Sequence, residues 1–435
     1  MTTLTELFLE VAHRVDGGML VRDALAADPT ILGALGNAAE APRVHVLAVG
    51  KVAFPMFEGL LSILGAGRIS GGLVVAPETR FPKDPKVPAA VACLVSDHPE
   101  PSMRSVAAAR AARDRVRSLS ASDRLVVLIS GGGSAALCLP AGELSLDEKR
   151  QTVREVSRAG ANITELNTVR KHLSAIKGGR LGSASQAPTI VLALSDVVGN
   201  DPGTIASGPF SPDPTTFAQA LALVEKLAPR SPARALAHLR QGAAGVISET
   251  PKEGDPRLSH IDYRLLAGPE RVSDEARRAA LSKGFTADAM SRNTESPVHD
   301  LARAYGERAR EEARRRGPAR IFIGNGEPTI VVGGNGKGGR ATHLALLMAR
   351  EISGLEHVSF LAAGTDDRDG SSDASGAVVD GATWTRAQDA GLDPAGSLAR
   401  CDSETPLKAL GCLVRGPGSS NLLDLHLLLI SPGSA

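Results

Sequence analysis

Apolar and polar positions in the first half of the chain alternate between short strand-like runs and longer helix-like stripes. Strand-like runs, rich in Val, Leu and Ile, occur at 44–49, 71–77, 91–96, 125–129 and 189–194. Between and after them, apolar residues recur at helical spacing over 53–64, 102–118, 146–159, 168–176 and 217–227. Strands that alternate with helices are typical of parallel βαβ units, so this half predicts a three-layer α/β domain.

The second half shows a similar alternation after a segment without strand signals. Strand-like runs lie at 263–266, 286–290, 320–323, 358–363 and 425–430, and helix-like stripes at 273–283, 298–316, 341–352 and 383–390. Residues 4–27 form a further helical stripe, broken at 16–18. Because 228–257 is rich in Ala, Arg, Gly, Pro and Glu, we predict a junction there and two α/β domains, 1–240 and 255–435, ending in a loose tail from 431.

Composition narrows the class of protein. The 435 residues carry 49 Lys and Arg against 48 Asp and Glu, a net charge of +1, which argues against nucleic acid or an acidic membrane as a partner. No apolar run approaches a membrane span, and the N-terminus lacks the pattern of a signal peptide. The four cysteines form no CxxC pair. These features predict a soluble cytoplasmic protein.

Residues suited to ligand binding follow the predicted strands. They stand at 50–51, 130–134, 195–196, 324–327 and 365–369. In open α/β sheets, ligands bind outside the carboxyl ends of the strands, so we expect these residues to line a site. Each such turn also has a simpler explanation, because an Asp after a strand often caps a helix and a lone Lys is usually solvated.

The stretch 320–350 is the most suggestive of phosphate binding. A strand-like run leads through GGNGKGGR, with Lys337 and Arg340, into a helix-like stripe. Such a loop can present backbone N–H groups and positive charge to a phosphate. A tight hairpin with solvated Lys and Arg explains the pattern equally well. The chain has no GxxxxGK[ST] motif, and the GxGxxG match at 334–339 lacks the acidic residue expected about 20 positions later.

The candidate residues have compatible chemistry. Glycines 131–133 with Ser134 can form an anion-binding nest, and Lys51 and Arg340 can stabilise charge on a transferring phosphoryl group. A carboxylate could accept a hydroxyl proton. Four carboxylates are oxygen ligands suited to Mg²⁺: Asp196, Glu327, Asp366 and Asp369.

Several motifs together resemble one family, the class II glycerate 2-kinases (glycerate kinase/MOFRL family, often labelled hydroxypyruvate reductase). The matching segments, which include ISGGGSA at 129–135 and GKGGR at 336–340, are 48–53, 129–135, 166–174, 177–181, 195–199, 206–209, 212–217, 326–329, 336–340, 364–366, 369–370 and 373–376. They span roughly residues 5–425, in the family's order.

The resemblance implies a Rossmann-like three-layer N-terminal domain, a C-terminal α/β MOFRL domain and an active site in the cleft between them. The implied reaction transfers the γ-phosphate of ATP to the 2-hydroxyl of D-glycerate, with Mg²⁺, and Lys51 and Arg340 match the family's active-site Lys and Arg. We add Asp196 to this catalytic set as a hypothesis, since it lies in a motif that lines the cleft. The expected substrate- and nucleotide-binding residues are Gly50, Ser130, Gly131, Gly132, Gly133, Ser134, Arg170, Lys171, Asn325, Glu327, Lys337, Gly338 and Thr365. A homodimer is one option for the assembly.

This sequence departs from the family pattern beside two proposed site residues. Ala341-Thr342-His343 follows Arg340, and Asp367 replaces a glycine after Asp366. These departures concern the identity of the acceptor more than phosphoryl transfer. Two alternatives stay open: a nicotinamide-dependent hydroxypyruvate reductase, for which no acid is placed to hold a ribose, and a non-catalytic ligand sensor.

Overall fold

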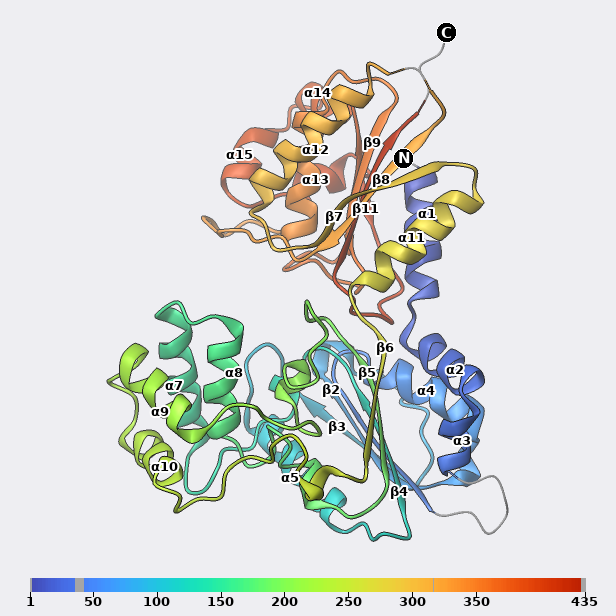
Figure 1. Cartoon of the computed structure of the whole chain (residues 1–435). Coiled ribbons are helices and arrows are strands. Elements are labelled where there is room, and N and C mark those ends of the chain that lie inside the picture. Colours follow the sequence, from blue (N-terminus) through green and yellow to red (C-terminus); the bar gives the residue numbers. More distant parts are fainter. Residues whose placement is uncertain (1, 36–42, 316, 432–435) are drawn as a thin grey trace. The chain divides into compact units, whose positions relative to one another are not determined.

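The strand-like runs form two separate sheets in the computed structural model, which describes residues 2–35, 43–315 and 317–431. Two compact units result: an N-terminal unit, Gly17–Leu266, and a C-terminal unit that joins Met1–Asp16 to Ala267–Ala435. The expected α/β architecture is confirmed in both (Figure 1).

The sheet of the N-terminal unit has the order β3-β2-β1-β4-β5-β6, and β1 to β5 are parallel. Its strands are β1 (Val44–Val49), β2 (Ile69–Pro77), β3 (Val91–Ser96), β4 (Arg124–Ile129), β5 (Thr189–Leu194) and β6 (Ile261–Ala267). The strands β1, β4 and β5 are buried almost throughout, which fits apolar runs covered on both faces. This strand order is that of a Rossmann-like doubly wound fold.

Helices lie on both faces of this sheet. The helices of the unit are α2 (Gly17–Ala27), α3 (Pro29–Leu35), α4 (Ala53–Leu64), α5 (Met103–Arg117), α6 (Gly133–Ala136), α7 (Leu146–Arg158), α8 (Ile163–His172), α9 (Phe217–Leu227) and α10 (Ala233–Ala243). Helices α2 and α4 pack together on one face, and α5 packs on the other (Figure 1). Helices α7 to α10 form a separate cluster with an apolar core of its own.

The sheet of the C-terminal unit is mixed, with the order β11-β10-β9-β12-β8-β7. Its strands are β7 (Thr286–Thr294), β8 (Arg320–Gly326), β9 (Val358–Gly364), β10 (Gly376–Asp380), β11 (Leu413–Val414) and β12 (Asp424–Ile430). Only β7 and β8 pair in parallel, whereas β12 runs antiparallel to both β8 and β9. The predicted α/β class is confirmed for this unit, but its sheet is mixed, unlike the parallel sheet of β1 to β5.

The helices of the C-terminal unit lie on both faces of its sheet. They are α1 (Thr2–Arg14), α11 (Glu270–Ser282), α12 (Val298–Glu312), α13 (Arg340–Glu351), α14 (Thr383–Asp389), α15 (Pro394–Ala399) and α16 (Glu404–Ala409). Figure 1 shows α12 to α15 on one face and α1 with α11 on the other. Helix α13 is buried over most of its length, as its apolar stripe requires.

The observed division differs from the predicted boundaries at two places. Helix α1 belongs to the C-terminal unit, because its apolar stripe packs on α11 and β9. The segment after residue 240 stays with the N-terminal unit, because β6 extends that unit's sheet beside β5. Helix α10 lies where the sequence predicted an irregular junction.

Residues 330–339 form neither strand nor helix, although Ile330-Val331-Val332 is a β-branched run. Residues 432–435 of the predicted tail lie outside the described residues, as does Arg316, the predicted end of a helix. Within the described part of the chain, no helix is long and apolar enough to cross a membrane.

Candidate functional site

Two predicted loops meet where the strand order of the N-terminal sheet reverses. Gly50 and Lys51 follow β1, and the glycine turn, residues 130–134, follows the adjacent strand β4. The backbone N–H of Lys51 donates to the carbonyl oxygen of Gly131 at 2.9 Å, and the N–H of Val52 donates to Ser130 Oγ at 3.0 Å. Ligands of doubly wound sheets bind at this position, outside the carboxyl ends of the strands.

The glycine turn lies against Lys51 and His98. Gly132 has a φ of +81°, and a Cβ atom on it would lie 3.2 Å from Cγ of Lys51 and 3.1 Å from Cδ2 of His98. Burial, with the charges of Lys51 and Arg80, lowers the pKa of His98 to about 4. This imidazole is therefore neutral at pH 7 and adds no charge beside the turn.

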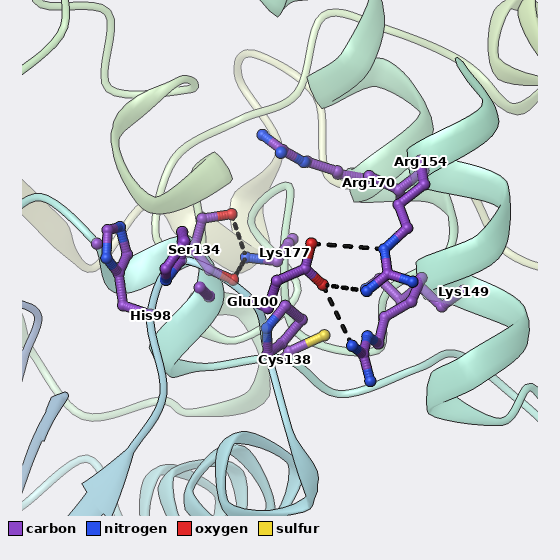
Figure 2. A pocket seen from close by; sticks show the side chains of 14 residues that line it. His98, Glu100, Ser134, Cys138, Lys149, Arg154, Arg170 and Lys177 are labelled. Carbon is purple, nitrogen blue, oxygen red and sulfur yellow. Dashed lines mark hydrogen bonds and ion pairs between the residues drawn. The ribbon is translucent and has the colours of Figure 1, made fainter. Parts of the chain in front are cut away.

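A cavity of about 310 Å³ opens beside the glycine turn (Figure 2). Gly132 and Ser134 form one wall, and five cationic side chains line the rest: Lys149, Arg150, Arg154, Arg170 and Lys177. Glu100 is the one carboxylate in the lining, and it pairs with Arg150 at 3.3 Å and with Arg154 at 2.8 Å. Three basic side chains of the lining, Lys149, Arg170 and Lys177, therefore remain beyond those that Glu100 pairs with.

The side chain of Lys177 fixes the glycine turn through hydrogen bonds to its last residue, Ser134. Its Nζ donates to the carbonyl oxygen of Ser134 at 2.9 Å, to Ser134 Oγ at 3.0 Å and to the carbonyl oxygen of Ala206 at 3.2 Å. Burial, with the charges of Lys149 and Arg170, lowers the pKa of Lys177 well below its usual value. A lysine is found in the interior here because its ammonium group forms these hydrogen bonds to the glycine turn and to Ala206.

Lys149 and Arg170 have no carboxylate partner among the described residues. Lys149 is 3% exposed and its Nζ has no hydrogen-bond partner, while Arg170 reaches only Asn167 Oδ1, at 3.4 Å. Burial lowers the pKa of both groups. Arg170 was predicted from the sequence and Lys149 was not, although Lys149 stands on the buried stripe of α7 with Thr152 and Val156.

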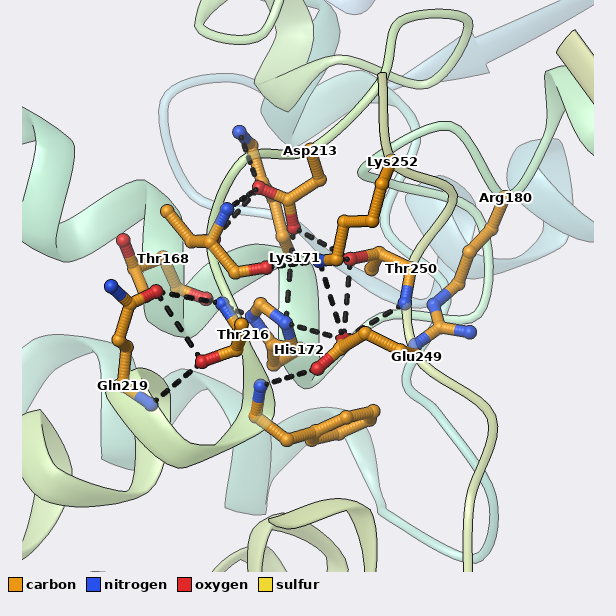
Figure 3. Close-up of polar contacts among 12 residues, drawn as sticks. Thr168, Lys171, His172, Arg180, Asp213, Thr216, Gln219, Glu249, Thr250 and Lys252 are labelled. Atoms are coloured by element: carbon orange, nitrogen blue, oxygen red, sulfur yellow. Dashed lines mark hydrogen bonds and ion pairs between the residues drawn. The ribbon is translucent and has the colours of Figure 1, made fainter. Parts of the chain in front are cut away.

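Lys171, by contrast, does not line this cavity. It points into a buried polar network (Figure 3). Its Nζ contacts Asp213 Oδ1 at 3.2 Å, and His172 Nε2 lies 3.0 Å from Glu249 Oε1. Although burial acts in the opposite direction, Lys171 and Thr215 hold the pKa of Asp213 below its usual value. These contacts favour a structural role for Lys171, tying α8 to the loops around 213 and 249.

In the C-terminal unit, Arg340 is held by two carboxylates. Its Nε and Nη2 donate to Asp424 at 2.7 and 3.1 Å, and its Nη1 donates to Glu327. Burial opposes the charge of Arg340, but Asp424 and Glu327 together raise its pKa. Arg340 and Glu327 were predicted as site residues, whereas the buried Asp424 of β12 was missed because it precedes an apolar run.

The N-terminus of α13 already has an anion from the chain itself. The Asp369 carboxylate accepts from the backbone N–H of Ala341 at 3.0 Å and from the N–H and hydroxyl of Thr342, both at 2.7 Å. A side chain on Gly339 would collide with this carboxylate. Asp369 therefore serves as a helix cap, and these N–H groups do not face a phosphate.

Replacing Asp369 by alanine should destabilise the C-terminal unit by about 2–4 kcal/mol, because it leaves buried donors at the start of α13 without an acceptor. Burial and Asp424 raise the pKa of Asp369 from 3.8 to about 6. The folded state thus binds a proton on Asp369 more tightly than the unfolded state does. The stability gained from this protonation is fully present below about pH 4 and is lost as the pH rises to about 6. Urea unfolding should therefore show a larger effect of Asp369→Ala at pH 4 than at pH 7.

Asp373→Ala is the matched control for this prediction. Asp373 is exposed and pairs with Lys337 and Arg368, so its loss should leave the stability close to that of the wild type. Equal effects of the two substitutions would contradict the capping role of Asp369.

The other predicted binding residues of the C-terminal unit also have partners in the chain. Lys337 Nζ lies 3.0 Å from Asp373 and 3.2 Å from Glu404, and the Gly338 N–H donates to Ser371 Oγ. Asn325 donates to Pro269 and Asn293 and accepts from Ser273 and Asn293, which uses its whole amide. Thr365 Oγ1 donates to Leu423 and accepts from Leu422. These contacts favour structural roles.

The four predicted metal ligands do not form one cluster within either unit. Asp196 follows β5 in the N-terminal unit, and the other three belong to the C-terminal unit. Of those, Glu327 pairs with Arg340 and Asp369 caps α13, while Asp366 Oδ1 and Asp424 Oδ1 both approach Gly364. Among the described residues, no group of three or more His, Cys, Asp or Glu side chains is arranged to hold a metal ion.

Comparisons with known proteins cover nearly the whole chain. The sequence model described as "Domain of unknown function (DUF4147)" matches residues 3–240, and that of the MOFRL family matches 320–424. The D-glycerate 2-kinase of Thermotoga maritima is 34% identical over 89% of this chain and 91% of its own length. The glycerate 2-kinase of Pyrococcus horikoshii is 33% identical over 89% and 88%.

A protein of Agrobacterium vitis provisionally named hydroxypyruvate reductase is 35% identical over 93% of this chain and 91% of its own length. Among solved structures, the glycerate kinase of Thermotoga maritima superposes with a TM-score of 0.84 at 32% identity, covering 99% of this chain and all of the other. The chain therefore belongs to the glycerate kinase family that combines a DUF4147 domain with a MOFRL domain.

Proposed function

We propose that this protein is an ATP-dependent kinase that phosphorylates the 2-hydroxyl of D-glycerate, giving 2-phosphoglycerate and ADP. The observation that carries the proposal is its similarity, over about nine-tenths of both chains, to the D-glycerate 2-kinase of Thermotoga maritima. Both the substrate acid and the nucleotide are anions, and the cationic cavity beside the glycine turn suits an anion.

The reaction requires charge stabilisation more than covalent chemistry, because the phosphoryl group passes through a loose transition state. Lys51 lies against the glycine turn, where an ammonium group can offset charge on phosphate oxygens. Asp196, after β5, is our candidate to orient the acceptor hydroxyl or to bind a cation. The roles of Arg340 and Glu327 stay predictions from the family resemblance.

Mg²⁺ belongs to the proposal as a companion of ATP. In kinases this ion is typically held by one or two carboxylates together with the phosphates of the nucleotide, so a preformed protein cage is not required. Asp196 in the N-terminal unit and Asp366 in the C-terminal unit each offer one such carboxylate. The ion would neutralise charge on the phosphates. The homodimer and the cytoplasmic location also stay predictions.

A coupled assay tests the proposal. ATP, Mg²⁺ and D-glycerate are mixed with the protein, ADP release is followed, and enolase reports the product, since enolase accepts 2-phosphoglycerate and not the 3-phospho isomer. We expect ADP release to require D-glycerate and to match enolase turnover one to one. ADP release without an enolase signal would place the phosphoryl group elsewhere or on another acceptor.

The same sample distinguishes the reductase alternative, which the Agrobacterium vitis relative's name suggests. A reductase would oxidise NADH or NADPH in the presence of hydroxypyruvate and would release no ADP. The low pKa of His98 makes this imidazole a poor proton donor to a carbonyl at pH 7. We expect no nicotinamide oxidation above background.

A further inference from the structure

The cavity beside the glycine turn holds two cationic side chains that the fold does not use. Three of its five cations have partners. Arg150 and Arg154 bind Glu100, and Lys177 binds Ser134 (Figure 2). Lys177 also donates to the Ala206 carbonyl oxygen. Lys149 and Arg170 have no carboxylate partner in the part of the chain that the structure describes. Lys149 is almost completely buried, and its ammonium group has no hydrogen-bond partner among those residues.

A buried cation without a partner is costly, and such groups are found where a ligand supplies the missing charge. Burial is the main cause of the lowered pKa of Lys149 and of Lys177. The charge of Arg170 lowers both pKa values further, and that of Lys149 lowers the pKa of Lys177. The three groups therefore lie close enough to repel one another. An anion in the cavity would relieve this repulsion.

We infer that Lys149 and Arg170 form the subsite for the carboxylate of a small hydroxy acid, the phosphoryl acceptor. The inference rests on the proposed kinase function and adds to it the residues that recognise the acid end of the acceptor.

Size and chemistry favour a small acid over the nucleotide. The cavity has a volume of about 310 Å³, at the lower end of the roughly 300–1,000 Å³ typical of drug-sized ligands. A guanidinium binds a carboxylate through two parallel hydrogen bonds, which fixes the orientation of a three-carbon acid. The ammonium of Lys149 adds a second charge at a buried position.

The position of this subsite also suits the reaction. Ser134 ends the glycine turn and lines the same cavity as Lys149 and Arg170. An acid held by these two cations would keep its hydroxyl groups near the turn, where Lys51 lies. Holding the acceptor in one orientation would raise the rate and would select among hydroxy acids.

The test compares Michaelis constants in Lys149→Met and Arg170→Met. Both changes keep most of the side-chain volume and remove the charge. We expect the KM for D-glycerate to rise about 10- to 100-fold in each variant, with the KM for ATP within about twofold of wild type, because a lost charge-assisted contact costs one to two powers of ten. Arg170→Lys should recover part of the loss.

Arg158→Met is the matched control. Arg158 lies on the same helix as Lys149, is exposed and does not line the cavity. Its substitution therefore shows how the loss of one positive charge outside the cavity affects the kinetics. Its KM for D-glycerate should stay within twofold of wild type. The melting temperature of Lys149→Met should not fall, because the buried ammonium makes no hydrogen bond. This separates lost binding from lost folding.

Isothermal titration calorimetry without ATP tests the subsite by binding alone, and so independently of whether the protein is a kinase. D-glycerate and inorganic phosphate are titrated into wild type and both variants. Heat with D-glycerate that disappears in Lys149→Met and Arg170→Met supports the subsite even if no turnover is found. Tighter binding of phosphate than of D-glycerate, a selective rise in the KM for ATP, or an unchanged KM for D-glycerate would overturn it.

Discussion

Replacing Lys51 by alanine should lower kcat for phosphoryl transfer to D-glycerate by about 10²- to 10³-fold while the protein stays folded. Lys51 follows β1 at the point where the strand order reverses, and its side chain passes the glycine turn beside Gly132. Its backbone N–H is already fixed on Gly131, so the substitution changes the side chain and leaves the loop in place.

Steady-state kinetics with ATP and D-glycerate varied in turn would measure this effect. Lys51→Arg should retain part of the activity, because it keeps the charge but not the shape of the ammonium group. Lys226→Ala, on the exposed side of α9 in the same unit, is the control and should behave like wild type. An activity of Lys51→Ala within threefold of wild type would remove Lys51 from the catalytic set.

Replacing Gly50 by alanine should destabilise the N-terminal unit by about 4 kcal/mol or more. Gly50 has a φ of +117°, and a Cβ atom would lie 2.5 Å from the Ser130 carbonyl oxygen and 2.8 Å from that of Gly131. Both neighbours are backbone atoms of the glycine turn, so neither can rotate away. The variant should therefore either move the turn or fail to accumulate as folded protein.

The variant Gly65→Ala is the control for Gly50→Ala, because it introduces backbone strain without a steric collision of the new Cβ atom. Gly65 has a φ of +76° at the other end of α4, but nothing lies within 4 Å of its Cβ position. It should cost only about 1–3 kcal/mol, the strain of placing alanine in a backbone conformation that glycine alone adopts readily. Thermal and urea unfolding of the two variants would show the difference. Similar losses would mean that the glycine turn tolerates displacement.

Local pattern predicted the sheet of the N-terminal unit well. The runs that became β1, β4 and β5 are apolar on both faces and end in glycine or serine, which leaves little choice between strand and helix. The right-handedness of βαβ connections restricts how such parallel strands can be joined, but it does not fix their order in the sheet.

This rule does not apply to most strands of the C-terminal unit, because they pair antiparallel. β12 enters its sheet antiparallel between β8 and β9, and β10, with the short sequence GAVVD, pairs antiparallel with β9. Strand direction here depends on long-range packing, which local periodicity does not contain. Helix α10 was missed for a related reason, because its Ala- and Arg-rich sequence resembles a linker.

Site residues divide in a similar way. The sequence motifs predicted Lys51, the glycine turn and Arg170 as site residues. In the structure of the N-terminal unit, Lys51 lies against the glycine turn, and the turn and Arg170 line the same cavity. Lys149 was missed because α7 is highly charged, and only its spacing from Thr152 and Val156 marks it as buried. Asp369 and Asn325 looked like ligand groups, but they satisfy backbone or side-chain donors that the sequence cannot place in space.

Phosphorus NMR of one reaction mixture tests the central claim most directly. Wild-type protein is incubated with ATP, Mg²⁺ and D-glycerate, and the spectrum is followed over time. We predict that the γ-phosphate signal of ATP decays as the phosphomonoester signal of 2-phosphoglycerate grows by the same amount. An unchanged ATP spectrum, or growth of inorganic phosphate alone, would contradict the assignment of this protein as a glycerate 2-kinase.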